Sequence, residues 1–87
     1  MNYRKMFLII QRDNLFDQYL DTIDKIKIWK VKSNHAGDFH KIQNIKELIQ
    51  EFEDVKTNIS KRLVLYDMAL NAPEHIQDIY QSILEHI

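Results

Sequence analysis

The stretch IQNIKELIQEFEDVKTNISKRLVLYDMAL, Ile42–Leu70, decides the fold of this 87-residue chain. Its apolar residues recur every three or four positions, as on one face of an α-helix. They are Ile42, Ile45, Leu48, Ile49, Phe52, Val55, Ile59, Leu63, Tyr66 and Leu70. Such a helix is about 43 Å long, whereas a compact domain of this size has a radius of gyration of about 12 Å. It must therefore lie along another long helix, bend, project from the body or pair with a second copy.

The two ends of this stretch differ in polarity. Up to about residue 56 the apolar residues lie on one face, whereas between Leu63 and Leu70 they point in every direction around a helix. A helix that is apolar on all sides is normally covered on all sides. We therefore expect residues 63–70 to form the centre of the core and to contact both other parts of the chain.

The N-terminal third, residues 3–32, fits two structures. Its apolar residues Phe16, Tyr19, Leu20, Ile23 and Ile26 keep helical spacing. The alternative is an α+β fold with strands near residues 5–11 and 26–32, because the first segment contains an unbroken apolar run and the second is rich in β-branched residues. A two-stranded parallel sheet would leave two open edges and bury little area. We therefore predict a helix.

Two polar segments divide the chain into three parts. Residues 33–38 contain the only glycine, and Asp38 is suited to cap the helix that follows. Pro73 cannot continue a helix but suits the first turn of the next one. The last segment carries a helical stripe of Ile76, Ile79, Tyr80, Ile83, Leu84 and Ile87. The predicted fold is all-α: a single small helical domain, residues 1–87, built as a long antiparallel helical hairpin plus a shorter C-terminal helix.

The composition narrows the functional classes. The chain has no cysteine, and this absence excludes disulfides and zinc–thiolate sites. Its net charge is −1. It contains neither a signal-peptide core nor a run of about 20 apolar residues, so we expect a cytoplasmic protein without membrane contact. Residues 1–44 carry eight Lys and Arg against five Asp and Glu, and residues 45–87 carry four against eight. This polarity favours contact with a second copy or a charged partner, or between the two halves of the hairpin.

The nearest approach to a metal or acid–base site is His35, Asp38 and His40. Zinc sites use His and carboxylate ligands, but this spacing matches no established site. The simpler interpretation is a polar loop in which the carboxylate caps a helix. We therefore predict no metal, no cofactor and no enzymatic activity.

A basic segment from Lys25 to Lys41 suggests nucleic-acid binding as an alternative function. Lysines neutralise phosphates and an exposed tryptophan can stack on a base. The candidate contacts are Lys25, Lys27, Trp29, Lys30, Lys32 and Lys41. Interspersed aspartates and the small net charge argue against this function, and we do not favour it.

The pattern of the long helix favours protein contact. Written as heptads, it has Ile45, Phe52, Ile59 and Tyr66 at position a and Leu48, Val55, Arg62 and Ala69 at position d. Arginine at a core-type position is costly unless it faces water, a carboxylate or another chain. The predicted partner-binding residues are Ile42, Ile45, Ile49, Phe52, Val55 and Arg62. We expect a small cytoplasmic regulator, inhibitor or adaptor that binds another protein, with a homodimer as the favoured form. An intramolecular three-helix bundle without a binding surface is the alternative.

Overall fold

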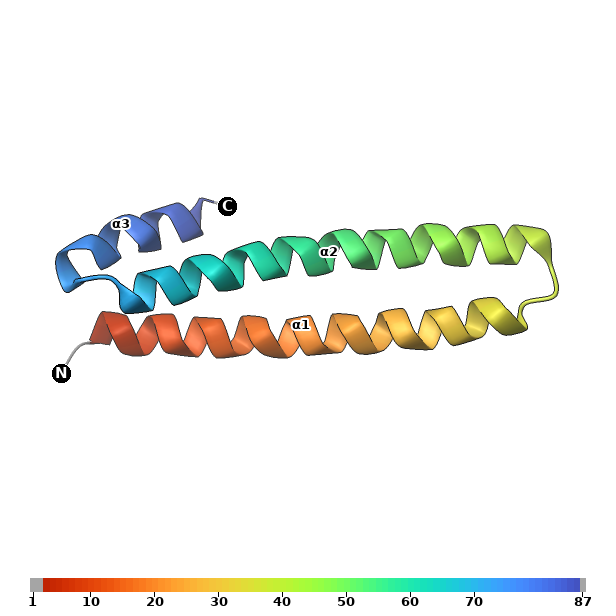
Figure 1. Cartoon of the computed structure of the whole chain (residues 1–87), viewed down its shortest axis with the longest axis horizontal. Coiled ribbons are helices and arrows are strands. Elements are labelled where there is room, and N and C mark those ends of the chain that lie inside the picture. The colour runs from red at the N-terminus through yellow and green to blue at the C-terminus, as the bar shows by residue number, and fades with distance from the viewer. Residues whose placement is uncertain (1–2, 87) are drawn as a thin grey trace.

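The computed structural model describes residues 3–86, which form three helices: α1 (Tyr3–His35), α2 (Phe39–Asn71) and α3 (Glu74–Glu85) (Figure 1). The described part of the chain contains no strand, so the all-α prediction is confirmed. The alternative strands near residues 5–11 and 26–32 are wrong, because both segments belong to α1. Ile87, the last residue of the predicted C-terminal stripe, lies outside the described residues.

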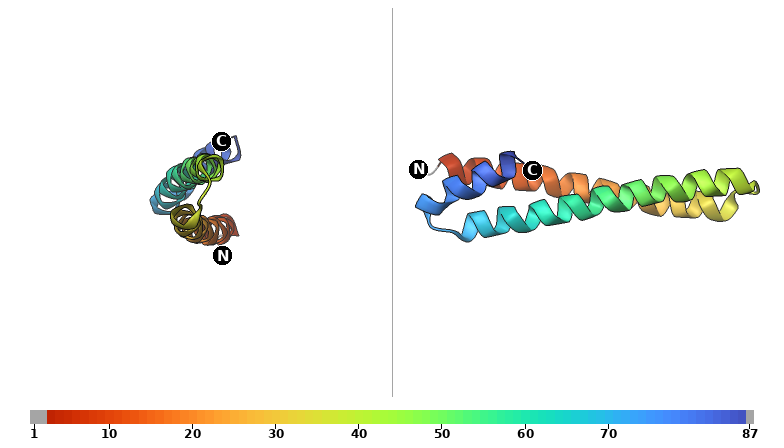
Figure 2. Two further views of the ribbon diagram at one scale, coloured as in Figure 1. Left: turned by 90° about the vertical axis from the view of Figure 1, so that its right-hand side faces the viewer. Right: turned by 90° about the horizontal axis from the view of Figure 1, so that it is seen from above.

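The two long helices form an antiparallel hairpin, as predicted. α1 and α2 have 33 residues each and lie side by side along most of their length (Figures 1 and 2). The molecule measures 57 × 20 × 14 Å, and its radius of gyration is 17.4 Å. A compact chain of this length would have a value of about 12 Å. The protein is therefore a rod whose length is set by the hairpin.

The turn between the long helices is shorter than the predicted loop. α1 continues to His35, so the connection has only three residues, 36–38. The Asp38 side chain accepts a hydrogen bond of 2.9 Å from the His40 backbone N–H. This bond satisfies one of the backbone donors that every helix leaves unpaired at its N-terminus. The predicted cap is therefore present, and it places the start of α2 beside the end of α1.

A second short turn folds α3 back along the C-terminal part of α2. Pro73 stands immediately before α3, and its carbonyl accepts hydrogen bonds from the N–H groups of Ile76 and Gln77. α3 therefore runs in the same direction as α1 and antiparallel to α2 (Figure 1). Its main packing partner is α2. An ion pair between Arg4 and Asp78 joins it to the first turn of α1.

The core is a narrow seam between the long helices. On α1 the buried residues Leu8, Leu15 and Thr22 recur every seven positions, as in an antiparallel coiled coil. Thr22 fits this seam because its hydroxyl donates a 2.8 Å hydrogen bond to the Gln18 carbonyl. On α2 the buried residues are Ile59 and Ala69. Most apolar side chains of the rod are therefore only partly covered.

The expectation that residues 63–70 would be covered on all sides is wrong. Ala69 is fully buried, but Val64 and Met68 retain 57% and 47% of their accessible surface. On α3, Ile79 and Ile83 are also exposed, although both belong to the predicted stripe. The physical reason is the number of neighbours: α1 and α3 cover only part of the circumference of α2, and the described residues supply no further helix.

Candidate functional site

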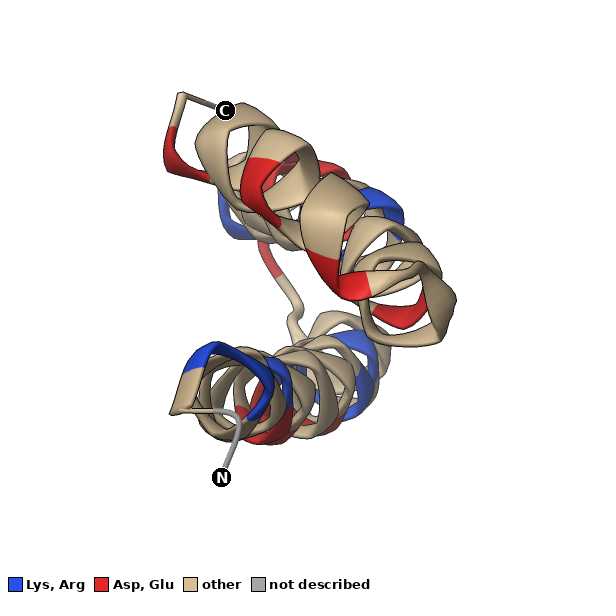
Figure 3. Cartoon of the chain, turned by 90° about the vertical axis from the view of Figure 1, so that its left-hand side faces the viewer, with Lys and Arg blue, Asp and Glu red and all other residues tan. Residues whose placement is uncertain are grey.

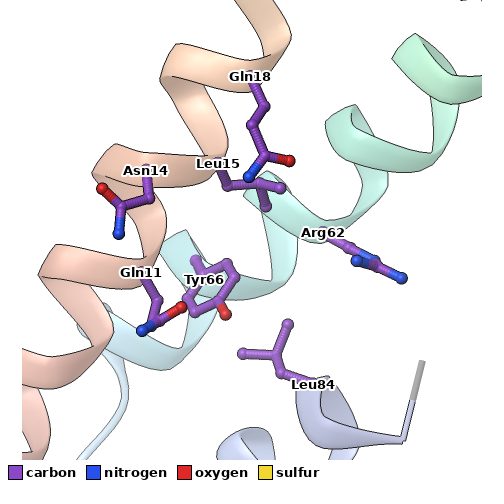
Figure 4. Close-up of a pocket in the computed structure, with 7 residues that line it drawn as sticks. All are labelled: Gln11, Asn14, Leu15, Gln18, Arg62, Tyr66 and Leu84. Atoms are coloured by element: carbon purple, nitrogen blue, oxygen red, sulfur yellow. The ribbon is translucent and has the colours of Figure 1, made fainter.

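A cleft lies between α1 and α3, with residues of α2 also lining it (Figure 4). Figure 3 shows the backbone at this end of the rod, where α3 lies beside α2 and apart from α1. The volume of the cleft is about 170 Å³. Gln11, Asn14, Leu15 and Gln18 line it from α1, Arg62 and Tyr66 from α2, and Leu84 from α3. An adjoining hollow of about 160 Å³ extends it along α3 to Gln81 and Glu85. The cleft exists because α3 packs mainly on α2 and leaves a neighbouring face of α1 uncovered.

The cleft lies on one side of the hairpin, which we call a flank. Each long helix contributes to this flank a column of residues that are seven positions apart in the sequence. On α2 this flank is the predicted column Leu48, Val55, Arg62 and Ala69. Ala69 is fully buried and Arg62 lines the cleft, whereas Leu48 is half-buried and Val55 is 46% exposed. In a hairpin with coiled-coil packing, a seven-residue column stays on the same side of the neighbouring helix. The end of this column that lacks α3 is thus the more exposed one.

The matching column on α1 is Gln11, Gln18, Lys25 and Lys32. The two glutamines line the cleft, and the two lysines continue the column as exposed residues. α3, with 12 residues, spans about 18 Å, whereas each long helix spans about 50 Å. α3 therefore covers only one end of the flank. We call the remainder, formed by Lys25, Lys32, Leu48 and Val55, the open flank.

The structure divides the predicted partner-binding residues into two groups. Ile42, Ile45, Ile49 and Phe52 are half-buried, and their spacing from buried Ile59 places them along the interior of the hairpin. They belong largely to the contact with α1. Val55 and Arg62 lie on the flank instead: the first is on the open flank and the second is at the edge of the cleft.

The predicted nucleic-acid contacts are partly engaged within the chain. Lys25 pairs with Asp21 at 2.9 Å, and Lys30 approaches Glu53 at 3.9 Å. The ammonium of Lys32 lies 4.4 Å from the centre of the half-buried Trp29 ring. Lys27 and Lys41 are exposed. The segment therefore presents a mixed surface in which the tryptophan face is occupied by a lysine of its own helix.

The structure does not assemble the three candidate metal ligands. His35 ends α1, Asp38 caps α2, and His40 stands in the first turn of α2. Within residues 3–86, no group of three or more His, Cys, Asp or Glu side chains is arranged to hold a metal ion. The one resolved pKa shift in this part of the chain raises the pKa of Lys56, through a 3.0 Å hydrogen bond and the charge of Glu53. That shift belongs to an ion pair on the surface of α2.

Comparison of the chain with protein-family models, curated proteins and solved structures gave no match. No helix within the described residues is long and apolar enough to cross a membrane. The least predictable part of the site is the cleft, because Gln11, Asn14 and Gln18 carry no apolar signal. Only the seven-residue interval between Gln11 and Gln18, which Lys25 and Lys32 continue, marks a common flank.

Proposed function

We propose that this chain is a non-enzymatic protein-contact module, a small regulator, inhibitor or adaptor that works through the open flank and pairs with itself as a homodimer. The observation that carries the proposal is excess surface. The accessible area is 6431 Å², whereas a folded monomer of 10.5 kDa exposes about 5,400 Å². The difference of about 1,000 Å² resembles the roughly 800 Å² that each partner buries in a standard interface.

The distribution of apolar side chains supports the same function. Five apolar residues of the described chain are buried, and three of them lie on α1: Leu8, Leu15 and Ile26. Chains of this size supply little core stability of their own, and association is a common way to add it. On the open flank, Leu48 and Val55 are apolar, while Lys25 and Lys32 form a charged border. An apolar centre with a polar rim is the usual anatomy of a protein interface.

Paired substitutions on α2 test which surface is used. Val55→Arg introduces a charge on the open flank, and Val64→Arg introduces the same charge at an exposed position outside the flank columns. We expect the first variant to be monomeric and the second to retain the mass of the unmodified protein in sedimentation velocity. Far-UV circular dichroism should show unchanged helicity for both. If both variants associate like the unmodified protein, the open flank is not the contact surface.

A further inference from the structure

The open flank continues the surface on which α3 packs, and its two edges carry opposite charges. We propose that it binds an amphipathic helix of another protein, which carries carboxylates on the edge that faces α1 and a basic residue on the edge that faces α2. The proposal rests on the open flank as the contact surface of the proposed function. Since the partner helix and a second copy use the same surface, they compete for it.

The open flank is continuous with the contact between α3 and α2. Leu48, Val55, Arg62 and Ala69 form one seven-residue column on α2. Where α3 is present, Ala69 is fully buried, and Leu84 of α3 lines the cleft together with Arg62. Because such a column keeps to one side of a helical hairpin, a helix that docks on Leu48 and Val55 continues the line of α3. α3 is therefore an internal example of how this flank holds a helix.

The part of α2 beyond α3 is long enough for a partner helix. Leu84 lies one residue before the end of α3 and shares the cleft with Arg62, so residues 39–59 of α2 extend past α3 (Figure 1). At 1.5 Å per residue this stretch spans about 30 Å. A helix of about five turns fits that length. Docking of an amphipathic helix along helical residues is a common mode of protein recognition.

The hairpin core is incompletely covered at the open flank. Leu15 and Thr22 are buried on α1, whereas Trp29, the next residue at the same seven-residue interval, is only half-buried. Trp29 lies four residues after Lys25 and three before Lys32, so the three side chains share one face of α1. Within the chain, the ring is approached by the ammonium of Lys32, at 4.4 Å from the ring centre. A docked partner helix covers the exposed part of this ring.

The α1 edge of the flank is suited to carboxylates. Its seven-residue column consists of Arg4, Gln11, Gln18, Lys25 and Lys32. At the start of this column Arg4 pairs with Asp78 of α3. Glu85, seven residues after Asp78, borders the hollow that Gln11 also lines. α3 thus turns carboxylates towards the α1 column, and a partner helix with two carboxylates seven residues apart meets Lys25 and Lys32 in the same way.

The α2 edge of the flank has the opposite sign. Glu51 is exposed, and it shares a helix face with Leu48 and Val55 because it lies three residues after one and four before the other. A basic residue on the partner helix pairs with it. The 2.9 Å pair of Lys25 and Asp21 joins two exposed side chains, so exchanging it for an intermolecular pair costs little. Because reversing a helix exchanges its edges, a given partner binds in one direction.

A designed helical peptide of five turns tests the proposal. It carries leucines on its docking face, glutamates on one edge, lysines on the other and no tryptophan, so that Trp29, the only tryptophan of the chain, reports binding. We expect a saturable shift of the Trp29 emission to shorter wavelengths. A control peptide with lysines on both edges should bind at least about tenfold more weakly, since it opposes Lys25 and Lys32 with like charges. Equal binding of the two peptides, or no change in emission up to millimolar peptide, overturns the proposal.

A charge reversal on the protein locates the contact. Lys25→Glu should weaken binding of the designed peptide at least about tenfold, and a peptide with lysine in place of the glutamate that faces residue 25 should recover most of the loss. Lys27→Glu is the matched control, because Lys27 is an exposed lysine of the same helix outside the flank column. If Lys25→Glu binds the peptide as well as the unmodified protein does, the helix docks elsewhere and the proposal is wrong.

Sedimentation velocity with the designed peptide separates this proposal from the homodimer. If both hold, the peptide converts the dimer into a complex of one chain and one peptide. A chain that is monomeric at every concentration but binds the peptide contradicts the homodimer and supports the helix site. A dimer that keeps its mass and its Trp29 emission at saturating peptide contradicts the helix site alone.

Discussion

Arg4 on α1 and Asp78 on α3 form an ion pair with 2.6 Å between Nη2 and Oδ1. The two residues are separated by nearly the whole chain, and their contact lies at the end of the rod where both helices begin. The pair therefore marks the position of α3 along the flank, which the packing of α3 on α2 determines. That position determines which part of the flank is covered by the chain itself and which part stays open.

The contribution of this pair to stability should be small. Both side chains are well exposed, that of Asp78 to 62%, and exposed ion pairs contribute about 0.2–1 kcal/mol. We expect Arg4→Ala to lower the free energy of urea unfolding by less than about 1 kcal/mol, with a smaller effect in high salt. A loss that is larger and independent of salt would show that Arg4 has a packing role.

The seam residue Leu8 should be far more sensitive. It is 1% exposed, and replacing a buried leucine by alanine costs about 2–5 kcal/mol through lost burial and the cavity left behind. We expect Leu8→Ala to destabilise the protein to this extent in thermal or urea unfolding. Leu20→Ala is the matched control, because Leu20 is an exposed leucine of the same helix. Equal losses for the two variants would contradict the described seam.

Thr22 is a polar residue in an otherwise apolar seam, and Thr22→Val should be tolerated. The hydroxyl donates to the carbonyl of Gln18, and removing a hydroxyl while keeping the shape leaves no new unpaired polar group in the side chain. We expect a change in unfolding free energy of no more than about 1 kcal/mol, with a gain as the expected direction. Urea unfolding gives the value. A loss of several kcal/mol would indicate that the hydroxyl has a further partner.

The ion pair of Lys56 and Glu53 should give a pH-dependent contribution. Glu53 raises the pKa of Lys56 above the ordinary value of 10.5, so this contribution is fully present below that pH and is lost as the pH rises through the raised pKa. We expect the stability difference between the unmodified protein and Glu53→Gln to shrink under strongly alkaline conditions. A difference that stays constant there would contradict the assigned cause of the shift.

Nucleic acid should not change the fluorescence of Trp29. Its ring is half-buried and lies near the ammonium of Lys32, so it is poorly placed for stacking on a base. We expect no quenching on addition of DNA or RNA at low salt. Quenching that weakens steeply with added salt would support the alternative function, because phosphate binding depends strongly on ionic strength.

The hairpin could be predicted from the sequence because Ile42–Leu70 has one clear period and Asp38 is a strong helix cap. The surroundings of residues 63–70 could not be predicted, since periodicity shows which faces are apolar but not how many neighbours will cover them. The sequence pattern of the long helix predicts Val55 and Arg62 as partner-binding residues, and this stays a prediction. Which predicted partner-binding residues lie inside the hairpin and which lie on its flank becomes clear only once α3 is placed. The placement of α3 depends on its packing against α2, which the sequence pattern does not define.

The most direct test of the central claim is the mass of the unmodified chain by sedimentation equilibrium over a wide range of concentration. Self-association through the open flank predicts a mass that rises from the monomer value of 10.5 kDa towards twice that value and then stops rising. A mass that remains at the monomer value up to high micromolar concentration would contradict the proposed homodimer. A mass that continues to rise beyond the dimer would contradict association as a closed homodimer.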